Sequence, residues 1–181
     1  FSPAETGLYS VAYNLIYTPL MQLLGNLQSV IFAAASKVTS DEEGYRRAVT
    51  GTLTLSSMFF FPVFVGLSVA SEAFVGIVLG TKWLESSAVL ALLAPSFAFA
   101  AAQGLLTPYL WGKGVVEREM GIQLLVAAIA LIVLLTLLEQ GILAVASGAL
   151  LIAFVRFTLV LSVVKSTFEI TWKNILKGLI P

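Results

Sequence analysis

Charged side chains are absent, or nearly absent, from five long stretches of the chain, and these stretches are rich in apolar residues. A helix that crosses a bilayer needs about 20 such residues. The bilayer also forces a crossing segment to be helical, because a lone strand would leave backbone groups unpaired. The pattern therefore predicts an all-α membrane protein with about five transmembrane helices in a single transmembrane domain, residues 1–181. The predicted spans are residues 8–35, 49–71, 87–111, 120–138 and 141–164.

The composition strengthens this prediction and removes most catalytic chemistry. Hydrophobic residues make up 59% and charged residues 11% of the 181 positions, whereas about 25% of a soluble domain is charged. The chain has no cysteine and no histidine, which excludes a disulfide framework, a thiol metal site and a histidine base. The formal net charge is zero, so nothing favours nucleic-acid binding. We expect neither an enzyme nor a protein that holds a metal or a cofactor.

Basic residues alternate from loop to loop along the chain. Eight lie in three regions that should face one side of the membrane, and one lies on the opposite side. Because basic loops stay in the cytoplasm, we expect the N-terminus to be periplasmic and the C-terminus cytoplasmic. The eight are Lys37, Arg46, Arg47, Lys113, Arg118, Lys165, Lys173 and Lys177, and the opposing residue is Lys82.

The two ends of the sequence suggest a fragment of a longer chain. The sequence begins at Phe1, and its first residues lack the basic and apolar regions of a signal peptide. Residues 166–181 are predicted to form an amphipathic surface helix or the approach to another span.

The ten acidic residues all fall outside the predicted spans and are interpreted as solvated loop charges. Near the second span, Thr39 or Ser40 is predicted to cap a helix whose first turn carries acidic residues, which suits the positive end of the helix dipole.

Arg156 is the one charged residue inside a predicted span, eight residues before Val164. An arginine near mid-span costs at least a few kcal/mol and usually faces a cavity or a partner. Its guanidinium could bind an anionic group such as a diphosphate, or the side chain could reach the inner headgroups by snorkelling. Two interpretations also stay open for the basic residues on the cytoplasmic side: they set the topology, or they gather anionic lipid headgroups. These are Lys37, Arg46, Arg47, Lys113 and Arg118.

Three stretches resemble the polysaccharide-exporting flippases of the MOP superfamily, the O-antigen and colanic-acid translocase type. They are GLYSVAYNLIYTPL (7–20), VIFAAASKVTSDEEGYRRAV (30–49) and LGTKWLESSAVLALLA (79–94). Ala33 and Lys37 replace the proline and the arginine that are usual in the second motif. The resemblance implies a larger, two-lobed helical bundle, of which this chain supplies most of one lobe.

The resemblance also implies a function in the bacterial inner membrane. Such proteins are thought to move polyprenyl-diphosphate-linked repeat units between leaflets by alternating access, which changes no covalent bond. The expected partners are membrane lipids, the lipid-linked oligosaccharide, the missing N-terminal lobe and the polysaccharide polymerase machinery. The residues that would line the substrate path are polar side chains in the first, third and fifth spans: Asn14, Tyr17, Gln22, Gln103 and Arg156.

Three alternatives remain open. A multidrug or cation antiporter of the same superfamily generally needs a carboxylate within the membrane, and none of the predicted spans has one. A membrane-embedded transferase or polymerase would need clustered acids or histidines at the membrane edge. A structural membrane subunit would need none of these groups.

Overall fold

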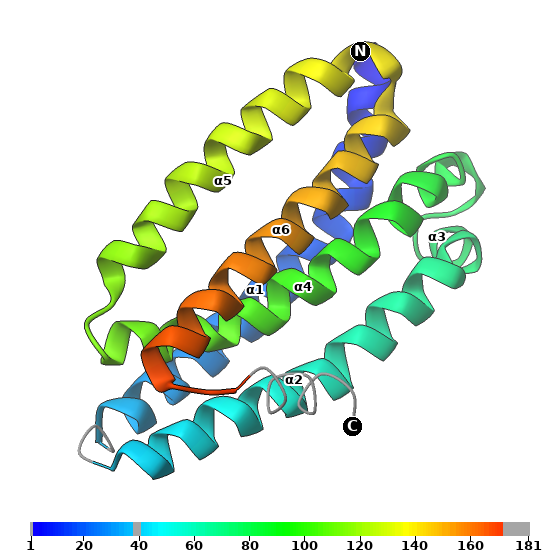
Figure 1. The fold of residues 1–181 in the computed structure, drawn as a ribbon. Coiled ribbons are helices and arrows are strands. Elements are labelled where there is room, and N and C mark those ends of the chain that lie inside the picture. The colour runs from blue at the N-terminus through cyan, green and yellow to red at the C-terminus, as the bar shows by residue number, and fades with distance from the viewer. Residues whose placement is uncertain (1, 38–40, 172–181) are drawn as a thin grey trace.

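The structure, a computed structural model, describes residues 2–37 and 41–171. Five long helices dominate these residues, and each is long and apolar enough to cross a membrane. The prediction of an all-α chain with five such helices is therefore confirmed. They are α1 (Pro3–Lys37), α2 (Glu42–Val69), α4 (Ser86–Gly112), α5 (Val116–Leu137) and α6 (Ile142–Phe168) (Figure 1). The short elements are α3 (Ser71–Val78), η1 (Thr81–Trp83) and η2 (Leu138–Gln140).

Helix α4 lies at the centre of the bundle and packs against α1, α2 and α6. Of the 18 consecutive residues that form the most apolar part of α4, 67% are buried inside the bundle. The corresponding share for the span that contains α5 is 6%. Figure 1 shows α5 on the outer side of α6, joined to it at one end by the turn at η2 and diverging from it toward the other. Helix α4 thus provides the core against which the other helices are positioned, and α5 is held mainly by α6.

A proline inside α4 is compensated by a side chain from a neighbouring helix. Pro95 has no N–H group, so the carbonyl of Ala91 lacks its usual helical donor. The hydroxyl of Ser68 donates a hydrogen bond to that carbonyl oxygen at 2.6 Å. The helix continues through the proline because α2 satisfies the carbonyl that the proline frees.

An aromatic contact fixes the ends of three helices beside the candidate site. Tyr45 of α2 is 1% exposed, and its hydroxyl donates to the carbonyl oxygen of Tyr109 at 3.0 Å. Its ring stacks on that of Phe168, with centroids 5.4 Å apart. A Cβ atom at Gly112 would lie 2.6 Å from the Tyr45 hydroxyl oxygen, so this approach of α2 to α4 requires glycine at position 112.

The starts of two helices differ from the sequence-based predictions. Asp41, rather than Thr39 or Ser40, caps α2, and its carboxylate accepts from the Gly44 amide at 2.9 Å. Helix α5 begins at Val116, which places Glu119 within the helix at 6% exposure. The interpretation of every carboxylate as a solvated loop charge is therefore wrong for Glu119. The predicted span began only at residue 120, after the last charged residue, whereas α5 already includes the charged residues of its first turn.

The predicted tail, residues 166–181, lies mostly outside the described residues. Helix α6 continues to Phe168. Glu169 then follows in the left-handed conformation, with φ 52°.

Candidate functional site

A polar pocket of about 280 Å³ lies where α1, α4, α5 and α6 meet. Residues that carry amide, hydroxyl, indole, carboxylate and guanidinium groups line it, although the helices that supply them are apolar overall. Because burying such groups without partners is costly, their convergence marks this pocket as the candidate site. The polar residues that line it are Gln28, Gln103, Thr107, Trp111, Glu119, Gln123 and Arg156.

Gln28 crosses from α1 to the backbone of α4. Its side-chain nitrogen donates to the carbonyl oxygen of Gly104 at 2.9 Å. Pro108 lies four residues after Gly104 and cannot supply the usual helical N–H. The hydrogen bond from Gln28 therefore fills the position that the proline leaves vacant, on the wall of the pocket.

Glu119 is a buried carboxylate held by two neutral donors. The indole nitrogen of Trp111 donates to its Oε2 at 2.5 Å, and the side-chain nitrogen of Gln123 donates to its Oε1 at 3.3 Å. In the described part of the chain, no lysine or arginine lies within ion-pairing distance of this carboxylate. The pocket therefore contains a fixed acceptor group with no described cation in direct contact.

Two further pocket residues have buried polar atoms with no hydrogen-bond partner among the described residues. Gln103 is 5% exposed, and its Oε1 has no donor. The Nε of Arg156 is buried and has no acceptor. An unsatisfied buried group costs about 1–3 kcal/mol. Among the described residues, three more such atoms lie outside this pocket: Arg46 Nε, Ser57 Oγ and Thr167 Oγ1.

The pocket brings together only two of the five predicted substrate-path residues, Gln103 and Arg156. The other three lie exposed on α1 and do not line it. The amide nitrogen of Asn14 donates to a backbone carbonyl one turn earlier, at 2.8 Å. Tyr17 stacks on Tyr13 with ring centroids 5.0 Å apart, and Gln22 is exposed.

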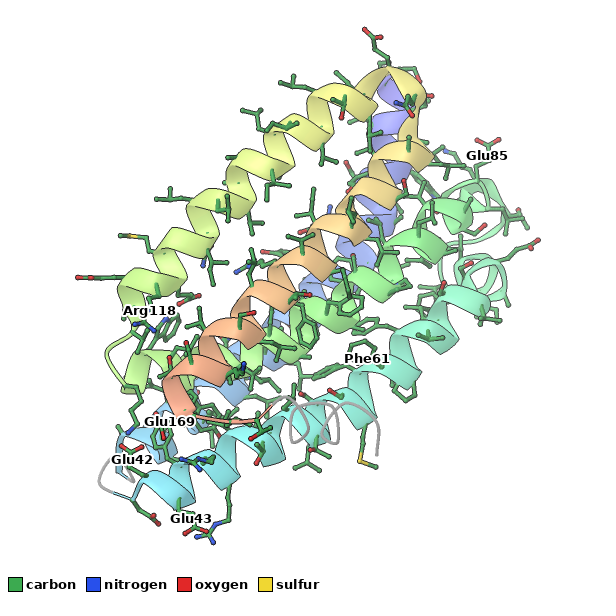
Figure 2. All side chains as sticks on the ribbon, in the orientation of Figure 1. Glu42, Glu43, Phe61, Glu85, Arg118 and Glu169 are labelled. Carbon is green, nitrogen blue, oxygen red and sulfur yellow. The ribbon has the colours of Figure 1, made fainter. Side chains whose placement is uncertain are left out.

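Two of the predicted basic headgroup residues pair with carboxylates on α2 or beyond α6. Arg46 lies 3.8 Å from Glu169, and Arg47 lies 3.4 Å from Glu43 one turn away. Figure 2 shows Glu42, Glu43 and Glu169 at the same end of the bundle as Arg118. These pairs are largely exposed. Each therefore contributes at most about 1 kcal/mol to the free energy of unfolding.

Lys113 also has partners, whereas Arg118 points outward. The ammonium group of Lys113 forms an ion pair with Glu42 and lies 5.1 Å from the ring centroid of Tyr45. Arg118 is exposed and, within the described residues, takes part in no ion pair. The side chain of Lys37 lies outside the described part of the chain.

Sequence reasoning did not select Gln28, Trp111, Glu119 or Gln123 as site residues. One signal was available for the last two: Glu119 and Gln123 are four residues apart, which places them on one face of a helix. The buried residues Ile122 and Val126 lie on nearly the same face. An earlier start for the fourth span would have placed Glu119 within the helix, on nearly the same face as Ile122 and Val126.

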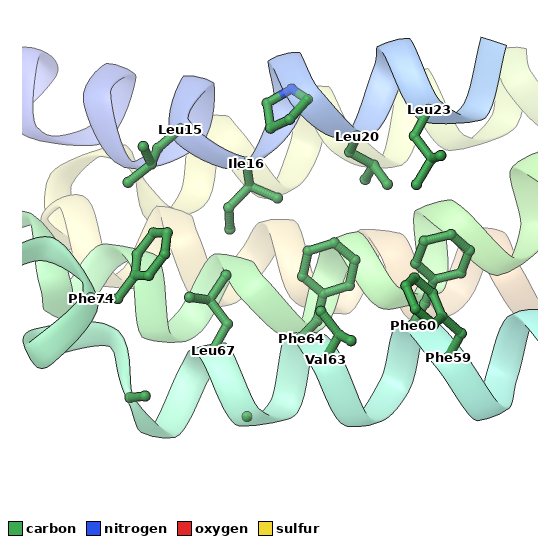
Figure 3. Close-up of a pocket in the computed structure, with 13 residues that line it drawn as sticks. Leu15, Ile16, Leu20, Leu23, Phe59, Phe60, Val63, Phe64, Leu67 and Phe74 are labelled. Carbon is green, nitrogen blue, oxygen red and sulfur yellow. The ribbon is translucent and has the colours of Figure 1, made fainter. Parts of the chain in front are cut away.

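An apolar groove of about 500 Å³ between α1 and α2 is not suited to the polar part of a ligand. Figure 3 shows Leu15, Ile16 and Leu20 facing side chains of α2 across it. Apolar side chains make up its walls, and they offer no hydrogen bond to a sugar or a phosphate. The polar pocket thus remains the candidate site.

The five crossing helices and the polar pocket inside them define a multi-pass membrane protein. Residues 1–88 match the polysaccharide biosynthesis protein family. The lipopolysaccharide biosynthesis protein WzxC of Escherichia coli is 37% identical over 87 residues, which cover 48% of this chain and 18% of that protein. The teichuronic acid biosynthesis protein TuaB of Bacillus subtilis is 27% identical over 88 residues, or 49% of this chain and 18% of that protein.

The match to the succinoglycan biosynthesis transport protein ExoT of Rhizobium meliloti extends further. It is 25% identical over 111 residues, which cover 61% of this chain and 22% of that protein. The chain is similar to polysaccharide biosynthesis and transport proteins, and the resemblance predicted from its three motifs is confirmed. The matched regions span about a fifth of the length of these relatives. No solved structure matches the chain.

Proposed function

We propose that this chain takes part in moving lipid-linked oligosaccharide across the bacterial inner membrane, for cell-surface polysaccharide synthesis, by alternating access. Relatives from three bacteria are named for the biosynthesis or transport of lipopolysaccharide, teichuronic acid and succinoglycan. The proposed substrate is a polyprenyl-diphosphate-linked repeat unit. The activity changes no covalent bond, and we therefore propose a transporter rather than an enzyme.

The polar pocket is the observation that carries this proposal. Its walls hold Arg156 and Glu119 within helices long and apolar enough to cross a membrane. Arg156 lies near the middle of α6, whereas Glu119 lies in the first turn of α5. Ionisable residues within membrane spans are costly and commonly mark a substrate or ion pathway. A chain that only anchored a complex would gain nothing from them.

The distribution of basic residues supports a periplasmic N-terminus for this chain and a cytoplasmic end for α6. Arg46 and Arg47 lie in the second turn of α2, Lys113 follows α4, and Arg118 lies in the first turn of α5. These helix ends lie together at one end of the bundle in Figure 1, while the segment between α3 and α4, which includes Lys82 of η1, lies at the other. Basic residues favour the cytoplasmic side. The remaining partners we propose are membrane lipids, a second lobe of the transporter and polysaccharide polymerase machinery.

The test is to deplete the protein in its own bacterium and follow the lipid-linked repeat units. We expect these units to accumulate on the inner leaflet, where an external glycan-modifying reagent cannot reach them in intact spheroplasts. Surface polysaccharide should fall in parallel. Unchanged surface polysaccharide together with an unchanged leaflet distribution would overturn the proposal.

A cation antiporter of the same superfamily is the second candidate, and Glu119 favours it. The sequence-based argument against this class was the absence of a carboxylate within a span, and the buried Glu119 in α5 removes that argument. Depletion distinguishes the two. An antiporter predicts greater sensitivity to drugs or sodium with normal polysaccharide output, whereas the flippase predicts the reverse.

A further inference from the structure

The two most exposed large apolar side chains in the described part of the chain lie beside or within the short helix α3. Val69 ends α2 and is 86% exposed, and Ile77 of α3 is 85% exposed. Ile77 falls between the predicted spans 49–71 and 87–111, where a loop in water would be polar. Exposed apolar side chains that gather on one element mark a surface that contacts a protein or a membrane.

The two sides of α3 have different surroundings. Ser71 and Val75 are buried on one side, and the helix packs against α4. Ala73 and Ile77 lie one turn apart on the opposite side and are both exposed. Val78, which is 51% exposed, extends this surface. We refer to Ala73, Ile77 and Val78 as the α3 edge. Because the inner side of α3 is held on the bundle, the α3 edge points outward from a fixed position.

The depth of α3 in the membrane follows from the length of α2. Arg47 is the last charged residue of α2, and residues 48–69 carry no charge. At about 1.5 Å per residue these residues rise about 33 Å, which is close to the hydrocarbon thickness of about 30 Å. Val69 therefore lies at the far boundary of the hydrocarbon when Arg47 lies at the near one. Figure 1 shows that α3 lies at this end of the bundle and does not extend α2 outward.

The residues around α3 are typical of a membrane–water boundary. Trp83 packs against the apolar core that includes Val75, and the ammonium group of the exposed Lys82 lies 6.0 Å from its ring centroid. Tryptophan favours the headgroup level, and a lysine stem can lie along apolar surface while its charge stays in water. Glu72 and Glu85 are also exposed, and Figure 2 shows Glu85 pointing away from the bundle.

From these observations we infer that α3 is an interfacial helix whose α3 edge inserts among the lipids at the headgroup–acyl boundary. Surface helices bury their apolar side at this depth. A protein partner is disfavoured because protein interfaces are rich in aromatic residues, methionine and arginine, and the α3 edge is wholly aliphatic. In the proposed orientation the contacted leaflet is the outer one. The inference goes beyond the proposed function, because it holds whatever the chain transports.

Insertion of α3 also bears on the apolar groove between α1 and α2. Phe74, on the same helix, lines one end of that groove (Figure 3). A membrane-inserted α3 holds this end of the groove at the level where the lipid chains begin.

The test measures the depth of labels on the α3 edge in liposomes of phosphatidylethanolamine and phosphatidylglycerol. It uses the full-length protein as encoded in its own genome, with any cysteine outside this chain replaced by serine. This chain has no cysteine, so Ile77→Cys and Ala73→Cys each provide a single site for a bimane label. The quenchers are iodide in the water and lipids that carry a nitroxide near the headgroup or near the end of the acyl chain.

We expect the shallow nitroxide to quench bimane at positions 73 and 77 several-fold more strongly than iodide does. Two control sites calibrate the depth. Glu85→Cys should be quenched mainly by iodide. Leu124→Cys, near the middle of α5 and 68% exposed, should be quenched mainly by the deep nitroxide.

Two results would overturn the inference. Quenching of positions 73 and 77 by iodide, to the extent seen at position 85, would place the α3 edge in water. Protection of both positions from every quencher would show that another protein surface covers it. Neither result depends on the outcome of the depletion experiment, so the interfacial helix and the proposed transport can fail separately.

Discussion

Gln28 of α1 donates a hydrogen bond to the carbonyl oxygen of Gly104 in α4, at 2.9 Å. That carbonyl lacks its helical donor because Pro108 follows it by four residues. The contact therefore ties two helices together, closes one wall of the polar pocket and satisfies a backbone group that lipid could not satisfy.

Gln28→Leu should lower the free energy of unfolding by about 0.6 kcal/mol, and by no more than about 1.7 kcal/mol, which are the mean and the maximum measured for hydrogen bonds between membrane helices. Removing the amide leaves the Gly104 carbonyl without a donor. Reversible unfolding of the purified protein in a titration with sodium dodecyl sulfate measures the change.

A second background tests the cause of that effect. Pro108→Ala restores a backbone N–H four residues after Gly104, so Gln28→Leu should cost much less in this background than in the wild type. An equal cost in both backgrounds would show that Gln28 stabilises the fold in some other way.

Gly148→Ala should destabilise the protein by about 1–3 kcal/mol, as overpacking does. A Cβ atom there would lie 2.7 Å from Val133 and 2.8 Å from Leu137, where α6 contacts α5. Gly121→Ala on α5 is the matched control because nothing lies within 4 Å of the added atom. It should raise helix stability by up to about 1 kcal/mol. The same unfolding titration compares them, and equal effects would contradict the close approach of α5 and α6.

Arg156→Leu should reduce polysaccharide export to near the level of the depleted strain, because it removes the charged donor from the pocket. Arg118→Leu changes an exposed arginine and should leave export near normal. Surface polysaccharide and protein abundance are measured together, so that degradation is not mistaken for lost transport. Normal export by Arg156→Leu would favour a structural subunit. A changed repeat-unit length or structure would favour a transferase or polymerase.

Reporter fusions test the proposed orientation. Reporters placed after Val49 and after Lys113 should give cytoplasmic signals, and one placed after Lys82 should give a periplasmic signal. The reason is that Arg46, Arg47, Lys113 and Arg118 lie at or near helix ends that Figure 1 shows at one end of the bundle, and basic residues favour the cytoplasmic side. The reversed set of signals would contradict the orientation while leaving the five crossing helices in place.

Much of the fold follows from the sequence because the bilayer permits few alternatives. Apolar length determines that each span is a helix. Exact helix starts do not follow from the same rule. Charged residues can belong to a first turn, as Glu119 does, and a side chain such as Asp41 can provide the cap in place of its neighbours.

The candidate site was only partly predictable for a different reason. Arg156 stands out because a charge in an apolar span is costly, and Gln103 stands out as an amide between two prolines. Which other residues join them depends on how the helices pack. The exposed position of Gln22 and the inward position of Gln28 depend on the rotation of α1 against α4, and a single span does not encode that rotation.

The hydroxyl of Ser68 and the carbonyl that Pro95 frees form a pair whose members depend on each other. A chain that kept proline at position 95 but lost the donor at position 68 would expose a bare carbonyl inside the bundle. A chain that lost the proline would release position 68 from its constraint. Among diverged homologues, substitutions at positions 68 and 95 should therefore be correlated. That correlation would reveal the contact between α2 and α4 from sequences alone.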